Sequence, residues 1–148
     1  MWNPDVTVAA ICEKDDKFLL VEERAKSSGQ IVLNQPAGHL EQGETIIQAV
    51  VRETVEETQC RFTPESLIGL YRLEGTEGKT YIRYAFHGSV SEPDLELTLD
   101  QDIIRTHWMS LSQIESAHNL RSPLVLQCIH DYLSGISFPL SLVKEVVI

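Results

Sequence analysis

Residues 38–60 read GHLEQGETIIQAVVRETVEETQC, and this stretch decides the fold. Its apolar side chains recur every three or four positions, which is the spacing of one face of a helix. Thr45, followed three positions later by Gln48, is a capping-box signature that marks where such a helix begins. The pattern therefore predicts a helix over residues 45–58, preceded by a tight loop that contains glycine.

The polar face of this predicted helix carries three carboxylates. Glu53, Glu56 and Glu57 are three and four positions apart, so all of them project to one side of the helix. Clustered carboxylates repel one another, and oxygen ligands of this kind suit a hard divalent cation such as Mg²⁺. The spacing therefore predicts a metal site on this face.

The loop before the helix supplies further candidate residues. Gly38 permits a tight loop whose backbone carbonyl could face the metal. Glu44 lies just before the helix, where the helix dipole favours an acid. Glu44 could also pair with Arg52 and hold that guanidinium beside the carboxylates.

These positions resemble the Nudix box, a motif of the Nudix hydrolase family. The resemblance implies an α/β fold of the mixed α+β type, an α/β/α sandwich with a mixed β-sheet between helices. It also implies a single Nudix hydrolase domain over residues 1–148, with the box at 38–60. Two positions depart from the motif. Thr54 replaces an apolar residue, although its hydroxyl can bond to the carbonyl one turn earlier, and Gln59 replaces a glycine. The matched positions are Gly38, Glu44, Arg52, Glu53, Glu56 and Glu57.

The resemblance implies roles for the residues of the box. Glu56 and Glu57 are expected to bind Mg²⁺, with Mn²⁺ as an alternative, together with the carbonyl of Gly38. Glu53 is expected either as a third metal ligand or as the general base that activates water. Arg52 belongs to the catalytic set as the residue that orients these carboxylates.

A second acidic segment lies outside the box. Residues 88–102 contain five acids and no base, which is half of the chain's net charge of −10. The resemblance implies that an acid from this region reaches the metal or the attacking water. Asp100 and Asp102 immediately precede a predicted strand, and of the two we favour Asp102 as the catalytic residue, with a solvated linker as the alternative.

Five other polar residues are expected to contact the substrate. Gln35 and His39 flank the loop of the box, and Arg83 could line the pocket from the sheet. Asn119 and Arg121 precede a predicted helix, where a group of hydrogen-bond donors suits an anion. For each of these residues the alternative is a purely structural role.

Two segments narrow the resemblance to the NudJ branch of bacterial Nudix phosphatases, namely 34–41 and 119–125. That likeness implies Mg²⁺-dependent release of phosphate from nucleoside di- and triphosphates and from thiamine-type diphosphates (thiamine or hydroxymethylpyrimidine diphosphate). Two alternatives stay open. One is internal cleavage of compounds such as ADP-ribose or dinucleoside polyphosphates, although the Pro or Tyr that marks such subfamilies is missing from residues 75–78. The other is a catalytically silent nucleotide-binding module.

The rest of the chain is expected to alternate between strands and helices, with Trp108 in the core. Strands are predicted over residues 6–12, 18–22, 31–33, 67–73, 80–90 and 106–109, and helices over 110–117 and 123–133.

Composition limits the partners of the protein. The chain has 12 Lys and Arg against 22 Asp and Glu, which disfavours nucleic acid and anionic membrane surfaces, because both attract clustered bases. The expected partner is a small-molecule phosphoanhydride substrate. The three cysteines are isolated and odd in number, which fits a reducing compartment and a cytoplasmic location. We expect a monomer, with a dimer as the alternative.

Overall fold

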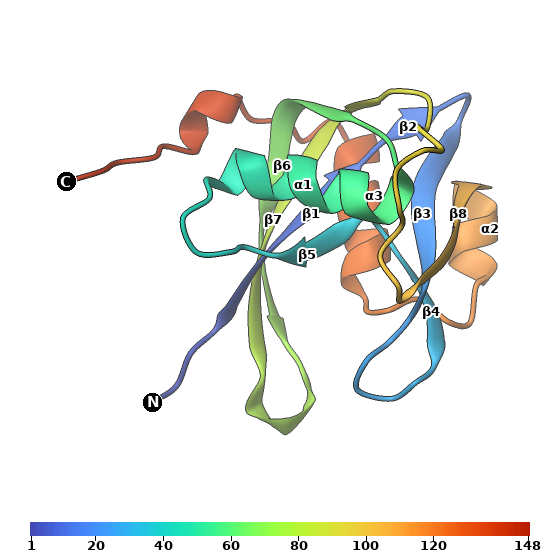
Figure 1. Ribbon diagram of the computed structural model, residues 1–148, viewed down its shortest axis with the longest axis horizontal. Coiled ribbons are helices and arrows are strands. Elements are labelled where there is room, and N and C mark those ends of the chain that lie inside the picture. The colour runs from blue at the N-terminus through green and yellow to red at the C-terminus, as the bar shows by residue number, and fades with distance from the viewer.

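A computed structural model describes residues 1–148, in which strands and helices alternate along the chain (Figure 1). The helices are α1 (Ile46–Thr58), α2 (Leu111–Ser116) and α3 (Leu124–Leu133), and short 3-10 turns cover Thr76–Gly78 and Leu140–Leu142. The strands are β1 (Asp5–Ile11), β2 (Glu13–Lys14), β3 (Lys17–Arg24), β4 (Ile31–Asn34), β5 (Ala37–His39), β6 (Phe62–Glu74), β7 (Thr80–Val90) and β8 (Ile103–Ser110).

The strands form two sheets of four. In the first, the order is β5-β1-β7-β6, with β1 and β7 parallel and the other neighbours antiparallel. This sheet is mixed, as the sequence predicts. The second sheet is antiparallel, with β3 paired to β2, β4 and β8. The sequence does not separate its strands from those of the mixed sheet.

Helices cover both faces of the mixed sheet, as predicted. Successive side chains of a strand point to opposite faces, so β1 contributes to two separate cores. Val8 packs with Val50 of α1 on one face, and Ala9 packs with Val125 of α3 on the other. Figure 1 shows α1 in front of the sheet and α3 behind it.

The helix of the box forms as its sequence predicts. Thr45 caps α1, and the reciprocal bonds of the capping box with Gln48 are both present. Thr54 is fully buried, and its hydroxyl donates to the carbonyl of Val50 at 2.8 Å. Gln59 ends the helix with φ 62° and ψ 12°, the left-handed conformation that glycine adopts more easily.

Three features differ from the expectations. The residues Ala37–His39 form a strand beside β1 where a loop is expected. Strand β6 begins at Phe62, earlier than predicted, and it pairs with β7 along almost its whole length. Trp108 is 37% exposed rather than buried, and its strand β8 pairs only with β3.

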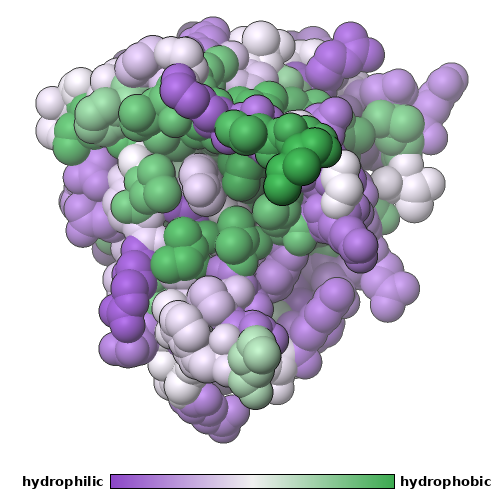
Figure 2. All heavy atoms as spheres, turned by 90° about the vertical axis from the view of Figure 1, so that its left-hand side faces the viewer, coloured by the Kyte–Doolittle hydropathy of each residue, from purple (hydrophilic) through white to green (hydrophobic).

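Apolar side chains gather on the side of the molecule from which the C-terminal segment projects (Figures 1 and 2). In that segment Leu142, Val146, Val147 and Ile148 are exposed. No helix combines the length and the apolar character that a membrane span requires.

Candidate active site

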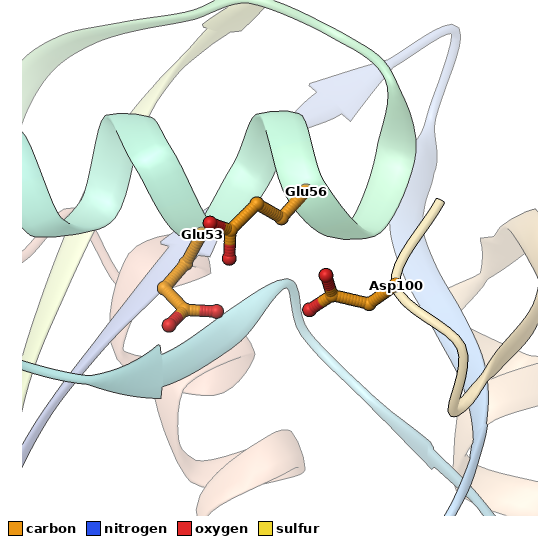
Figure 3. Close-up of side chains that lie close together, drawn as sticks. All are labelled: Glu53, Glu56 and Asp100. Atoms are coloured by element: carbon orange, nitrogen blue, oxygen red, sulfur yellow. The ribbon is translucent and has the colours of Figure 1, made fainter. Parts of the chain in front are cut away.

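Three carboxylates converge beside α1. Glu53 and Glu56 come from the helix, and Asp100 comes from the acidic segment between β7 and β8 (Figure 3). One oxygen of each carboxylate lies within 4.8 Å of the other two. Negative charges at this separation repel one another, and an oxygen-only donor set suits a hard divalent cation. These residues therefore fit the cation that the sequence predicts.

Arg52 lies against this group and connects it to the preceding loop. Its Nε and Nη2 donate to the two oxygens of Glu44 at 2.9 and 2.7 Å, a paired geometry that lysine cannot reproduce. Its Nη1 donates to Glu53 at 2.8 Å and to Glu56 at 3.2 Å. The hydrogen bond from Arg52 lowers the pKa of the Glu44 carboxyl. The expected Glu44–Arg52 pair is present, and it fixes the guanidinium where it contacts two of the three carboxylates.

Gly38 leaves the space that the Glu53 carboxylate occupies. A Cβ at position 38 would lie 2.1 Å from Cδ of Glu53 and 2.3 Å from each of its oxygens. Gly38 belongs to β5 and pairs with Val8 of β1, so its backbone is held in the sheet. Glycine is therefore needed here for the close approach of a carboxylate.

Glu57 lies deeper than the three converging carboxylates and is not one of them. It is 7% exposed, and its Oε1 accepts a hydrogen bond from the N–H of Ala37 at 2.9 Å. Burial raises the pKa of Glu57 well above its usual value, and the negative charges of Glu53 and Asp100 add to that effect. Burial also raises the pKa of Glu53 to about 7. Without a cation, the Glu53 carboxylate therefore takes up a proton near neutral pH.

The acid that joins Glu53 and Glu56 is Asp100, and the structure does not place the favoured Asp102 beside them. The N–H of Asp100 donates to the carbonyl of Glu56 at 2.9 Å, which ties it to the last turn of α1. Asp102 instead lies 3.7 Å from the Nζ of Lys26. This placement has a tertiary cause, because the two acids belong to one segment of sequence but lie against different neighbours.

Gln59 helps to hold the segment that carries Asp100. Its carbonyl accepts from the N–H of Asp94 at 2.9 Å, and its side-chain amide donates to the carbonyl of Leu97 at 2.5 Å. The glutamine that departs from the box motif thus contacts the acidic segment through both its backbone and its side chain.

His39 lies on the surface beside the box. Its Nε2 is 3.3 Å from Oδ2 of Asp5, and the Nζ of Lys79 is 3.1 Å from the same oxygen. The hydrogen bond from Lys79 is the largest influence on the pKa of Asp5, which is lowered. The side chain of His39 is 63% exposed at the end of β5, and its Nε2 faces Asp5.

Asn119 and Arg121 line a pocket of about 670 Å³ between residues 25–32 and 118–121. Both residues are exposed. Nη1 of Arg121 donates to Oε1 of Glu23 at 2.6 Å, and Nδ2 of Asn119 donates to the carbonyl of Ile31 at 3.3 Å. The ion pair with Glu23 uses only part of the donor capacity of Arg121.

Gln35 and Arg83 are buried, contrary to the expectation that they contact the substrate. They are 1% and 5% exposed. The Nε2 of Gln35 donates to the carbonyl of Val125 at 2.7 Å, and its Oε1 accepts from Nη1 of Arg83 at 3.0 Å. Both ends of the Gln35 amide are thus bonded within the protein. Proximity to the box in sequence does not tell whether a side chain points outward or into the core.

Glu23 is a buried carboxylate near the site, and it belongs to no motif of the sequence. It is 8% exposed, and burial raises its pKa, while Arg121 acts in the opposite direction. Its charge also raises the pKa of Glu57, so the two carboxylates are electrostatic neighbours. Glu22 and Glu23 are adjacent in β3, and nothing in the sequence tells which of the two turns inward.

Comparison with known proteins shows the family of the chain. The family model described as the NUDIX domain matches residues 1–127. The chain belongs to the Nudix domain family. The phosphatase NudJ of Escherichia coli (strain K12) is 37% identical to this Nudix protein over 145 residues, which is 98% of this chain and 94% of that protein.

Solved structures of other Nudix proteins have the same fold. A NUDIX hydrolase from Nitrosomonas europaea is 47% identical, with a TM-score of 0.93 over 97% of this chain and 98% of that chain. A MutT protein from Methanosarcina mazei Go1 is 23% identical, with a TM-score of 0.74 over 90% of this chain and 97% of that chain, and it shows the fold alone. The protein is therefore a Nudix hydrolase, an enzyme that acts on phosphoanhydrides.

Proposed function

We propose that this Nudix hydrolase is a Mg²⁺-dependent phosphatase that releases the terminal phosphate of small phosphoanhydrides. Its proposed substrates are nucleoside di- and triphosphates and thiamine-type diphosphates. The observation that carries the proposal is the convergence of Glu53, Glu56 and Asp100 beside the guanidinium of Arg52. The likeness to the phosphatase NudJ over nearly the whole chain supports release of phosphate in particular.

The proposed metal ligands surround the start of β5 and the last turns of α1. Glu56, Glu57, Asp100 and the carbonyl of Gly38 would hold Mg²⁺, and Mn²⁺ suits the same oxygen donors. When bound, the ion acidifies water and neutralises negative charge on phosphate oxygens. The hydrogen bond from Ala37 to Glu57 keeps that carboxylate in one orientation.

The remaining box residues complete the site. Glu53 is either a further ligand or the base that takes the proton of the attacking water. A pKa of about 7 suits a base that works near neutral pH. Arg52 fixes Glu53 and Glu56, while Glu44 holds Arg52 through two hydrogen bonds. We assign no reacting role to Asp102.

The residues that we propose to contact the substrate have exposed side chains. Arg121 would bind the terminal phosphate, because its guanidinium is partly exposed and keeps free donors beyond the pair with Glu23. Asn119 lines the same pocket, and His39 lies beside the box. Gln35 and Arg83 are too deeply buried to meet a ligand directly.

We also propose that the protein acts in the cytoplasm as a monomer, without nucleic acid or membrane partners. All three cysteines are free and buried, which is compatible with a reducing compartment.

A substrate panel with phosphate detection tests the proposal. The panel holds nucleoside di- and triphosphates, thiamine diphosphate, hydroxymethylpyrimidine diphosphate and ADP-ribose, each with Mg²⁺ and with EDTA. We expect release of orthophosphate from the diphosphates and triphosphates with Mg²⁺ only. Formation of a nucleoside monophosphate from ADP-ribose, without orthophosphate, would instead establish internal cleavage. A folded Glu57→Gln variant with full activity would contradict the proposed metal ligands.

A further inference from the structure

A buried polar network joins the mixed sheet to α3 behind the active site. Its centre is Arg83 of β7, which is 5% exposed and has no carboxylate in contact. Nη1 of Arg83 donates to Gln35, Nη2 donates to Asn34 at 3.3 Å, and its Nε has no hydrogen-bond partner. A buried cation paired only with neutral groups costs folding free energy. This cost suggests that the network serves the site rather than stability alone.

Gln35 is the member of this network that lies nearest to the box in the chain. Its amide bridges two elements, because it accepts from Arg83 of β7 and donates to the carbonyl of Val125 in α3. The bond to Val125 is 2.7 Å long, and Gln35 is 1% exposed. A side chain bonded at both ends in a dry environment has one orientation, so it fixes the backbone to which it is attached.

The backbone fixed by Gln35 leads directly to a proposed metal ligand. The carbonyl of Pro36 accepts from the N–H of Ala10 at 2.9 Å, and the N–H of Ala37 donates to Oε1 of Glu57 at 2.9 Å. Only Pro36, whose φ is locked by its ring, separates Gln35 from the residue that holds Glu57. A shift of the Gln35 backbone therefore moves the hydrogen bond that orients the Glu57 carboxylate.

We propose that Gln35 is a positioning residue for the metal site, acting through Ala37 and Glu57, and that it makes no contact with the substrate. The proposal rests on the proposed function in one respect, since it takes Glu57 as a metal ligand. Hydrogen-bond partners that orient metal ligands are worth about 10–100-fold in metal affinity or activity. Gln35 differs from such partners because it does not bond to the metal ligand itself. It instead fixes the backbone of Ala37, whose N–H donates to Glu57.

The test is a Gln35→Met variant, which keeps the size of the side chain and removes both hydrogen bonds. Binding of Mn²⁺ to the metal-free protein is measured by electron paramagnetic resonance of the free ion, which does not depend on turnover. We expect the dissociation constant for Mn²⁺ to rise about tenfold. At saturating Mg²⁺ we expect the KM for a nucleoside diphosphate to stay within about twofold of the unmodified value.

Gln127→Met is the matched control. Gln127 is an exposed glutamine of α3, the helix to which Gln35 bonds, and its amide donates to Asp131 at 3.1 Å. The substitution removes a glutamine hydrogen bond without touching the backbone of the box. We expect its Mn²⁺ affinity to equal that of the unmodified protein.

A double variant separates positioning from stability. Gln35→Met alone leaves Nη1 of Arg83 without its oxygen acceptor, although Nη2 keeps its bond to Asn34. Gln35→Met with Arg83→Met removes both members of the Gln35–Arg83 pair, which is the less costly change. We expect the double variant to regain thermal stability and to keep the weak Mn²⁺ binding, because its tether to Val125 is still missing. Recovery of Mn²⁺ affinity in the double variant would overturn the proposal in favour of a purely structural role.

Two further outcomes are decisive. Unchanged Mn²⁺ affinity in Gln35→Met together with a raised KM would overturn the proposal in favour of direct substrate contact. Failure of the proposed function would show instead in the unmodified protein, as absence of both Mn²⁺ binding and phosphate release.

Discussion

Replacing Gly38 by alanine perturbs the place where the backbone comes closest to the Glu53 carboxylate. The new Cβ would lie 2.1 Å from Cδ of Glu53, whereas real Cβ contacts are essentially never shorter than 3.0 Å. The carboxylate must therefore retreat by at least 0.9 Å, the difference between those two distances. Gly38 is not among the glycines with positive φ, so alanine adds no backbone strain there.

The expected loss falls on catalysis more than on folding. A misplacement of about 1 Å in a reacting group costs about 100-fold in rate, so we expect kcat to fall by about that factor. The displaced carboxylate is the far end of a flexible side chain, and its bond to Arg52 is the main contact at risk. A charged hydrogen bond contributes about 1.5–3 kcal/mol, so Gly38→Ala should still fold, with stability reduced by no more than that.

The assay combines phosphate release, Mn²⁺ binding and circular dichroism. A fall in kcat with unchanged Mn²⁺ affinity would identify Glu53 as the base, and a parallel loss of Mn²⁺ affinity would identify it as a ligand. Gly69→Ala is the control, because its Cβ would lie 3.4 Å from the Tyr71 ring, an ordinary contact. We expect the control to change kcat by less than about twofold.

The result that refutes the reasoning is a Gly38→Ala protein with unmodified kcat and unmodified Mn²⁺ affinity. Such a protein would mean that the Glu53 carboxylate can leave its place beside Gly38 without consequence, and that its position is not part of the mechanism.

The other predictions concern the remaining groups of the site. Asp100→Asn should weaken Mn²⁺ binding about tenfold, whereas Asp102→Asn should leave Mn²⁺ binding unchanged. Equal effects of the two substitutions in the same titration would show that Mn²⁺ affinity does not depend on the position of Asp100 beside α1. Arg52→Lys should lower kcat by at least about tenfold, because lysine cannot bond both oxygens of Glu44 and still reach Glu53; steady-state kinetics with unmodified kcat would contradict this. Burial raises the pKa of Glu53 from its usual 4.5 to about 7, so this group stabilises the metal-free fold at low pH, and its contribution is lost as the pH rises through 7. Thermal unfolding in EDTA should therefore show a loss of stability between about pH 4.5 and 7, the usual and the raised pKa of this group, and the loss should be smaller in Glu53→Gln; an identical loss in both proteins would count against the raised pKa.

Features that depend on near neighbours in the chain follow from the sequence. The helix over Ile46–Thr58 begins at its predicted cap, because the capping box needs only residues three positions apart. The spacing of Glu53 and Glu56 places both carboxylates on one face for the same reason, since 3.6 residues complete a turn. Thr54 bonds to the carbonyl one turn earlier, as its hydroxyl allows.

Contacts between distant segments do not follow from the sequence. Asp100 and Asp102 lie in one acidic stretch, and only the packing of that stretch against α1 brings Asp100 rather than Asp102 to Glu56. Ala37–His39 becomes a strand because β1 lies beside it, not because of any local preference.

The sequence by itself determined the family, the box helix and the carboxylates on it, because a helix converts spacing directly into direction. The tertiary structure alone decided which polar residues face a ligand and which support the site from within. No repeating pattern in the sequence shows which way the side chains of Gln35 and Arg83 point. Gln35 is held in the interior by Val125, 90 positions away, and by Arg83, 48 positions away. Long-range packing fixes such side chains, and no local pattern records it.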